Sequence, residues 1–204
     1  MIGSPDHLDV REDAITTFIT ATSSPDPKHG PASGPGALPL SGLTVADTIV
    51  LRETVRSALL GGMLGYRDPA EITASAEQAG LGTTEIREAF AELHRCSLIA
   101  VFGDHTTVVR VDVTPFGFLT GFPAAEPRAE EISHALITDL LGIDLDGPNR
   151  WLDVQALADR YGTVRLAIEQ LLGRLMDQGQ IGFLTTTGGC LLTRVNPALR
   201  RELR

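Results

Sequence analysis

The sequence of 204 residues predicts a mainly α-helical protein with small β-hairpins, an α+β fold class built as two copies of one unit. Three observations support this prediction. The apolar pattern recurs without a gap at an offset of 82 residues, a glycine stands where a short helix of each copy would end, and each copy closes with two short apolar runs joined by turn residues. Two copies with one pattern are expected to fold alike.

The third helix of each copy carries the clearest part of the repeat. Four apolar residues recur in register: Ile86, Ala89, Phe90 and Leu93 in the first copy, and Ile168, Leu171, Leu172 and Leu175 in the second. Their spacing of three and four residues places them on one helical face. We expect helices over 83–95 and 163–177, with the hydroxyls of Thr83 and Thr163 as N-caps.

The other elements complete the same unit in both copies. We expect helices over 45–60 and 75–80 and strands over 98–103 and 106–113 in the first copy, and helices over 130–141 and 154–162 and strands over 180–185 and 190–195 in the second. Gly80 and Gly162 end the short helices, because glycine readily adopts left-handed backbone there. This order predicts two winged helix-turn-helix domains in tandem.

The composition divides the chain into five segments. They are a short amphipathic helix at 1–20, a flexible linker at 21–42, a first winged-helix domain at 43–113, a phenylalanine-rich docked linker at 114–128, and a second winged-helix domain at 129–204. The flexible linker is rich in proline and glycine and has little apolar surface to offset its ordering entropy. The apolar side of the first helix either packs on its own domain or binds a partner protein.

Aromatic residues gather between the two domains. Phe116, Phe118 and Phe122 are three of the seven phenylalanines, and so much aromatic area is expected to be buried. These side chains either fix one domain against the other or form a homodimer interface. Trp151, the only tryptophan, is expected to pack within a short strand.

The composition argues against several classes of protein. A net charge of −9 argues against a basic coat for nucleic acid. The only cysteines, Cys96 and Cys190, form no clip, and the group His94, Cys96 and His105 lacks a further pair of ligands, so no disulfide framework and no metal are expected. No cofactor is expected either, and no GxSxG, HExxH or phosphate-binding loop points to an enzyme.

The chain is expected to be cytoplasmic and to have no membrane partner. The first residues do not have the basic and then apolar pattern of an export signal. The longest apolar runs, such as 98–102, are far shorter than the ~18 residues of a membrane span.

The turn and third helix of each copy resemble a known family. The string AEQAGLGTTE at 76–85, followed by IREAFAELHRCSLI at 86–99, resembles the signature of GntR-type bacterial transcription regulators, and ALADRYGTVRLAIEQLLGRLMDQGQI at 156–181 is similar to the same passage. The resemblance implies a regulator that binds duplex DNA, without the usual effector domain. It also implies DNA contacts at two positions of each copy, which hold Thr83 and Arg87 in the first and Arg165 and Glu169 in the second.

The candidate DNA-binding residues lie on the third helices and at the hairpin tips. They are Thr83, Thr84, Arg87, His105, Thr106, Arg160, Thr163, Arg165, Thr186, Thr187 and Gly189. Arginines there can reach phosphates or guanine edges, and tip hydroxyls and N–H groups can reach phosphates. The alternatives are solvated surface charges and ordinary hairpin tips. For Arg87 an ion pair within the helix is not expected, because no acidic residue stands three or four positions away.

Three functions remain open. In the first, both third helices read duplex DNA in the major groove, and the second copy with its arginine-rich end is the better candidate because it is the least acidic part. In the second, the chain is an acidic adaptor that binds another regulator, a polymerase subunit or a chromosome-organising complex; Glu85, Glu88 and Glu92 on the first reading helix favour this. In the third, one copy reads DNA and the other serves dimerisation or ligand sensing.

Overall fold

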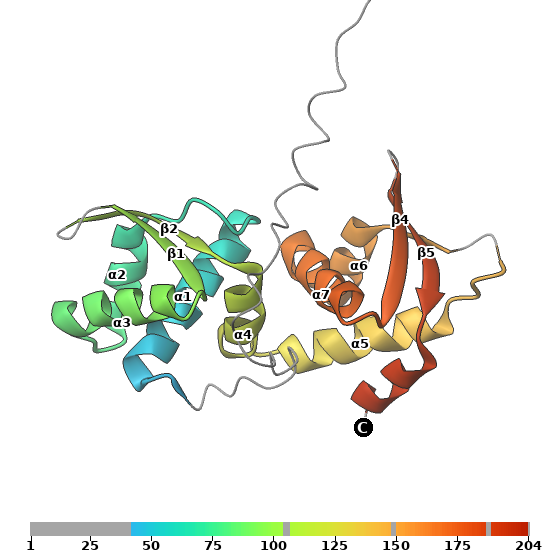
Figure 1. Ribbon diagram of the computed structural model, residues 1–204, viewed down its shortest axis with the longest axis horizontal. Helices are drawn as coiled ribbons and strands as arrows, with labels where there is room; N and C mark the ends of the chain where they lie inside the picture. The colour runs from blue at the N-terminus through green and yellow to red at the C-terminus, as the bar shows by residue number, and fades with distance from the viewer. Residues whose placement is uncertain (1–41, 104–106, 148–149, 187–188, 204) are drawn as a thin grey trace, which may run out of the picture. The chain divides into compact units, whose positions relative to one another are not determined.

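The computed structural model describes residues 42–103, 107–147, 150–186 and 189–203. The protein is mainly helical and has two small antiparallel sheets (Figure 1). The amphipathic helix expected at 1–20 and nearly all of the linker expected at 21–42 lie outside the described residues. Within the described part of the chain, no helix is both long enough and apolar enough to cross a membrane.

The first half of the fold consists of three helices and a hairpin. They are α1 (Val45–Gly61), α2 (Pro69–Gln78), α3 (Thr83–Arg95), β1 (Ile99–Gly103) and β2 (Val108–Val113). Helix α2 begins before the predicted residue 75, because Pro69 suits the first helical position and the Asp68 carboxylate accepts the Ala70 N–H at 2.8 Å. Strands β1 and β2 pair with Ile99 opposite Val113.

The second half repeats this order and adds two short elements. It consists of α5 (Ala129–Gly142), β3 (Trp151–Leu152), α6 (Val154–Tyr161), α7 (Arg165–Asp177), β4 (Ile181–Thr186), β5 (Gly189–Val195) and the 3₁₀ helix η3 (Pro197–Leu203). The strand order is β3-β5-β4, and Ile181 lies opposite Val195. This pair stands 82 residues after the pair of Ile99 and Val113, so the hairpins of the two halves share one register at their base.

The predicted apolar face of each third helix is buried. The buried residues are Ile86, Ala89, Phe90 and Leu93 on α3, and Ile168, Leu171, Leu172 and Leu175 on α7. In each half they pack with buried side chains of the other helices and of the hairpin, among them Val55 on α1, Val111 on β2 and Leu136 on α5. Burial of each large side chain in this core contributes about 1.5–3 kcal/mol to stability.

Residues 114–128, which the sequence suggested to be a docked linker, contain a helix. Helix α4 (Pro115–Ala125) begins after Thr114, whose hydroxyl accepts the Gly117 N–H at 2.9 Å. A Cβ on Gly117 would lie 1.8 Å from the Leu98 carbonyl oxygen, so only glycine permits this close approach. Sequence periodicity did not indicate α4, because the segment has almost no polar face and contains Pro123.

The three phenylalanines of α4 have different environments. Phe118 and Phe122 are buried, and their stacked rings lie 5.4 Å apart between centroids. Only Phe116, at 37% exposure, offers part of its ring to a partner. Helix α4 contacts α1 and also α7. The buried pair therefore packs within the chain's own fold, and the homodimer alternative for Phe116 stays a prediction.

Trp151 lies in the predicted short strand, but its side chain does not pack as expected. It is 53% exposed, whereas the next residue, Leu152, is buried. Successive side chains of a strand point to opposite faces, so a two-residue strand with Leu152 inside directs Trp151 outward.

Both third helices end with the same hydrogen-bonded motif around a left-handed residue. The Leu98 N–H donates to the Leu93 carbonyl at 2.9 Å, and the Gln180 N–H donates to the Leu175 carbonyl at 2.8 Å. The left-handed residue is Gly179 in the second half, with a φ of 66°, but Ser97 in the first, with a φ of 58°. A side chain in this conformation is strained, and glycine is not.

Replacing Ser97 with glycine is expected to stabilise the protein. The change Ser97→Gly removes the left-handed strain and should raise the free energy of unfolding by about 1 kcal/mol, while Gly179→Ser should lower it by a similar amount. Urea unfolding followed by circular dichroism measures both changes. Ser97→Ala is the control, because it keeps the Cβ and should bring no gain; an equal gain from alanine would contradict this explanation.

Candidate nucleic-acid interface

The turn between the second and third helices has the same geometry in both halves. In the first, the Leu81 N–H donates to the Ala76 carbonyl at 3.1 Å, next to Gly80 with a φ of 94°. In the second, the Thr163 N–H donates to the Ala158 carbonyl at 3.0 Å, next to Gly162 with a φ of 62°. Both glycines therefore hold the left-handed backbone that the sequence predicted for them.

The prediction that threonine hydroxyls cap the third helices is wrong in both halves. The N-cap of α3 is Gly82, whose N–H donates to the Glu85 carboxylate at 2.8 Å, while the Thr83 hydroxyl donates to Glu77 at 3.4 Å. The N-cap of α7 is Val164, and α7 begins at Arg165. In the first half, the acidic side chain at the third helical position takes over the capping role.

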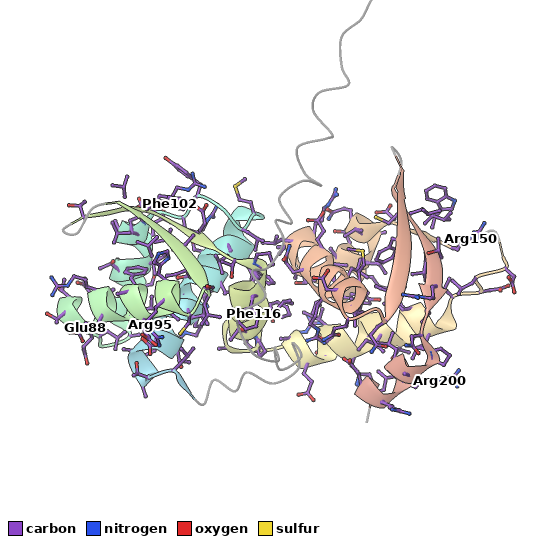
Figure 2. All side chains as sticks on the ribbon, viewed as in Figure 1. Glu88, Arg95, Phe102, Phe116, Arg150 and Arg200 are labelled. Carbon is purple, nitrogen blue, oxygen red and sulfur yellow. The ribbon has the colours of Figure 1, made fainter. Side chains whose placement is uncertain are left out.

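The first turns of α3 present an exposed surface. Thr83, Thr84 and Arg87 are exposed. Arg87 makes no hydrogen bond and no ion pair within the part of the chain that the structure describes, as the absence of acidic residues three and four positions away predicted. Its guanidinium is thus available to an external group, and the neighbouring Glu88 is also exposed (Figure 2).

The last turn of α3 is held by an ion pair of its own. Two nitrogens of the Arg95 guanidinium bond the Glu92 carboxylate at 2.8 and 2.5 Å. This hydrogen bonding lowers the pKa of Glu92 and raises the pKa of Arg95. The pair is exposed, so it adds little stability, but it neutralises the charge of Arg95 locally.

In the second half, the arginines selected from the sequence are paired with carboxylates. Arg165 donates to Glu169 one turn along α7 at 2.6 Å, which raises the pKa of Arg165. Arg160 donates to Asp139 of α5 at 2.5 Å. The same Asp139 oxygen accepts the Tyr161 hydroxyl at 2.6 Å, and the pKa of Tyr161 is raised, first by burial and then by this bond.

The first turn of α7 also differs from that of α3 in burial. Leu166 and Ala167 are buried, whereas Thr84 and Glu85, which hold the matching positions in α3, are exposed. Helix α7 contacts α4, and three residues separate the end of α4 from the start of α5. Thr163, selected as a DNA contact, is half-buried. The start of α7 therefore presents a smaller exposed surface than the start of α3, and its arginine is paired, while Arg200 and Arg201 at the end of the second half are exposed. The expectation drawn from the arginine content of the second half stays a prediction.

The hairpin tips can be compared with the sequence only in part. His105, Thr106 and Thr187 lie outside the described residues. Thr186 and Gly189 pair with each other at the ends of β4 and β5. The sequence placed these two residues in the tip, whereas the structure has them as the last pair of the two strands.

An arginine–aromatic cluster on the first hairpin was not found from the sequence. The Arg110 guanidinium carbon lies 4.8 Å from the centre of the Phe102 ring and 5.5 Å from that of Tyr66. Its Nε donates to Asp112 at 2.6 Å, and the Tyr66 N–H donates to the same carboxylate at 2.6 Å. Phe102 and Tyr66 are 46% and 73% exposed. The sequence pattern that could have indicated this cluster is the alternation in β2, which places Arg110 and Asp112 on one face of the strand and the buried Val111 and Val113 on the other.

Two residues of the group His94, Cys96 and His105, considered as metal ligands from the sequence, form hydrogen bonds within the protein. His94 Nδ1 lies 3.3 Å from the Ile99 carbonyl oxygen, and the Cys96 thiol lies 3.4 Å from a Glu92 oxygen. Burial and the bond to Glu92 raise the pKa of Cys96, which disfavours the thiolate that a metal needs. Among the described residues, no three histidine, cysteine or acidic side chains gather as metal ligands.

Removing the charge of Asp112 is expected to destabilise the first hairpin in a pH-dependent way. The bond from Arg110 lowers the pKa of Asp112 below its ordinary value of about 3.9. Its stabilisation is therefore complete above that pH and is lost as the pH falls through the folded-state pKa. Asp112→Asn should lower the free energy of unfolding by about 1 kcal/mol at pH 7, and the difference from the native chain should shrink below pH ~4.

Urea unfolding at pH 7, 4 and 3 measures this difference. Asp177→Asn, at the exposed end of α7, is the control and should lose no stability at any of these pH values. A constant difference between the native chain and Asp112→Asn would contradict the ionic contribution of Asp112.

Comparisons with protein-family models, with curated proteins and with solved structures find no match to this chain. The resemblance to GntR-type regulators therefore stays a prediction from the two helix-turn-helix strings.

Proposed function

We propose that the chain is a transcription regulator made of two winged helix-turn-helix domains, in which the first half reads duplex DNA and the second half binds a partner. The observation that carries this proposal is the difference between the third helices. The first turns of α3 expose Thr83, Thr84 and an unpaired Arg87, whereas the first turn of α7 is partly buried and its arginine is paired.

The order and pairing of the elements support the winged-helix part of the proposal. Each half has a long helix, a short helix, a turn with a left-handed glycine, a third helix and a two-stranded hairpin. In folds of this kind the third helix enters the major groove, with residues near its N-terminus at the base edges.

The side chains at the start of α3 suit this role. Arg87 can bond a guanine edge or a phosphate, and the hydroxyls of Thr83 and Thr84 can bond phosphates. The Glu85 carboxylate is bound to the Gly82 N–H, so it lies against the helix end. Glu88 stays exposed beside Arg87 and disfavours phosphates at that side.

The electrostatic part of the binding is therefore small. Each phosphate that the protein neutralises contributes about −0.9 to the slope of log K against log salt concentration, where K is the binding constant. With Arg87 as the unpaired cation on α3, we expect this helix to contribute a slope of about −1 per chain. A steep slope would require cations that this surface does not offer.

Removing Arg87 is expected to weaken DNA binding selectively. Duplexes enriched from a random-sequence pool by the full chain serve as the probe, and fluorescence anisotropy gives the affinity. Arg87→Ala should cost about 1–3 kcal/mol and flatten the salt dependence. Arg165→Ala removes the same charge from α7 and is the matched control; it should change the affinity little, because Glu169 already holds Arg165.

Two results would contradict the DNA-reading role of α3. One is an equal loss of affinity in Arg165→Ala and Arg87→Ala. The other is a pool from which the full chain enriches no duplex.

An acidic adaptor that binds a protein instead of DNA is the second candidate function. The Tyr66, Phe102 and Arg110 cluster favours it, because exposed tyrosine and arginine side chains are enriched among the energetic centres of protein interfaces. The net charge of −9 and the ion pairs of Arg95, Arg160 and Arg165 favour it too.

A further inference from the structure

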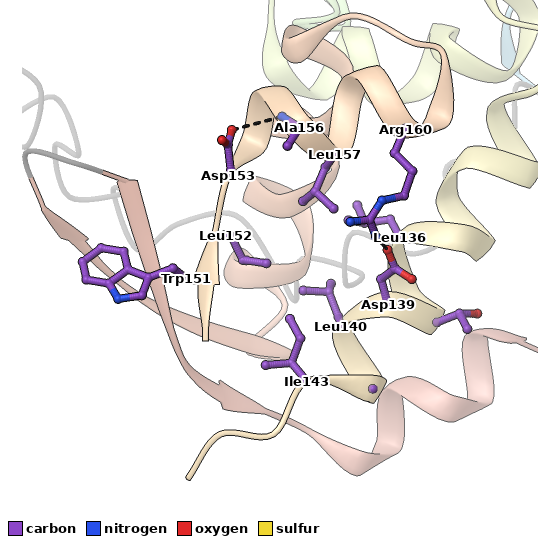
Figure 3. A pocket seen from close by; sticks show the side chains of 12 residues that line it. Leu136, Asp139, Leu140, Ile143, Trp151, Leu152, Asp153, Ala156, Leu157 and Arg160 are labelled. Atoms are coloured by element: carbon purple, nitrogen blue, oxygen red, sulfur yellow. Dashed lines mark hydrogen bonds and ion pairs between the residues drawn. The ribbon is translucent and has the colours of Figure 1, made fainter. Parts of the chain in front are cut away.

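A groove lies between α5 and α6 in the second half (Figure 3). Its volume is about 430 Å³. Its apolar lining includes Leu136, Leu140, Ile143, Leu152 and Leu157. Asp139, Asp153 and Arg160 add charged groups, and Trp151 contributes at one side. This combination of an apolar lining and a few charged groups is typical of a binding site.

The first half has an equivalent groove of about 320 Å³ between α1 and α2, and there an arginine forms part of the wall. The groove is lined by Ser57, Gly61, Arg67 and Glu71, among other residues. Arg67 Nη1 donates to the Ser57 carbonyl at 3.0 Å, and Nη2 donates to the Gly65 carbonyl at 2.9 Å. A Cβ on Gly61 would lie 2.0 Å from Arg67 Nη1, so the guanidinium rests directly on the α1 backbone. The α1–α2 groove of the first half thus accommodates a guanidinium group.

The second half has an arginine at the equivalent position, but this arginine leaves the groove. Arg67 exchanges backbone hydrogen bonds with Val111, and the Arg150 carbonyl accepts the Leu192 N–H at 2.9 Å. Val111 and Leu192 are fully buried on the second strand of their hairpins, so Arg67 and Arg150 hold matching places. Arg150 is exposed and donates to the Leu145 carbonyl at 3.3 Å, outside the groove (Figure 2).

The free acceptors of the α5–α6 groove suit a cation. Asp139 and Asp153 line it with one cation, Arg160, which is bound to Asp139. Arg165 on α7 is bound to Glu169 and also interacts with the charge of Asp153. Asp153 caps the Ala156 N–H through Oδ1 at 3.0 Å, and its Oδ2 accepts no hydrogen bond from the described residues. The C-terminal end of α5 at Gly142 adds the negative end of a helix dipole. An arginine satisfies both parts of the groove, because its methylene stem packs on apolar side chains while its guanidinium bonds carboxylates.

We propose that the α5–α6 groove binds an arginine side chain presented by a partner protein. The arginine lies at the C-terminal end of α5, as Arg67 lies against the end of α1, but its guanidinium faces the carboxylate of Asp153, whereas that of Arg67 bonds the Ser57 and Gly65 carbonyls. The proposal rests on the partner-binding role of the second half, and it does not depend on DNA reading by α3.

The only tryptophan of the chain makes the groove measurable. Trp151 lines the groove, so its fluorescence reports occupancy without a label. The probe is a short capped peptide with one arginine, added to the full chain. The matched peptide carries citrulline, which has nearly the same shape and no charge. The arginine peptide should change the emission saturably and bind about tenfold more tightly than the citrulline peptide. Equal binding of the two peptides, or no saturation with either, would overturn the proposal.

Variants of the chain locate the bound peptide. Asp153→Asn keeps the helix cap but loses the charge, and it should weaken the arginine peptide about fivefold. Asp177→Asn makes the same charge change on α7 and should leave the affinity unchanged, while Arg150→Ala should leave it unchanged or increase it. Equal weakening by Asp153→Asn and Asp177→Asn would show general attraction to an acidic surface and would overturn the groove as the site.

The same variants separate this proposal from the DNA-reading role. Arg87→Ala should leave peptide binding unchanged. If the peptide binds as expected while the pool enriches no duplex, the groove stands and the DNA-reading role falls. If duplexes are enriched but the peptide does not bind, the groove proposal alone is wrong.

Discussion

Burial of the apolar face of α3 and α7 is the interaction on which each half of the structure depends. On each of these helices the four apolar side chains of this face are buried. They belong to a core that also contains side chains of the long helix, α1 or α5, of the short helix, α2 or α6, and of the hairpin. Because this face looks inward, the opposite side of the helix must face outward unless another element covers it. Helix α3 remains open on that side, whereas Leu166 and Ala167 on α7 are buried. The same internal packing thus supports two different surfaces.

The sequence predicted what depends on local spacing. The period of the apolar residues located α3 and α7, and Gly80 and Gly162 located the turns before them, because a left-handed position after a helix strongly favours glycine. Helix α4 was not predicted, since a helix buried on most sides has no polar side to reveal its period. Thr83 was misjudged as a cap because α3 begins at Thr83 itself, one residue after the N-cap Gly82, whose N–H donates to Glu85.

The candidate site was harder to predict, because some of its ion pairs join residues that are close in the sequence and others join residues that are far apart. The pair of Arg165 and Glu169 follows from a spacing of four residues. Asp139, by contrast, is 21 residues from Arg160, and only the packing of α5 on α6 brings them together. Counting arginines therefore did not distinguish Arg160 and Arg165, which are paired, from Arg200 and Arg201, which are exposed. The cluster of Tyr66, Phe102 and Arg110 also joins segments that the sequence separates widely.

The two halves have diverged most where a single arginine changes direction. Arg67 and Arg150 follow the same backbone pairing, yet one turns onto the end of α1 and the other turns away from the end of α5. In the first half Arg67 lines the groove and bonds backbone carbonyls there, and the start of α3 and the hairpin have exposed side chains. In the second half the covered helix leaves little reading surface, and the open groove is the surface with matched apolar and acidic parts. The proposed division of labour between the halves rests on the direction of one side chain and on the burial of one helical turn, while both halves keep the order of three helices and a hairpin.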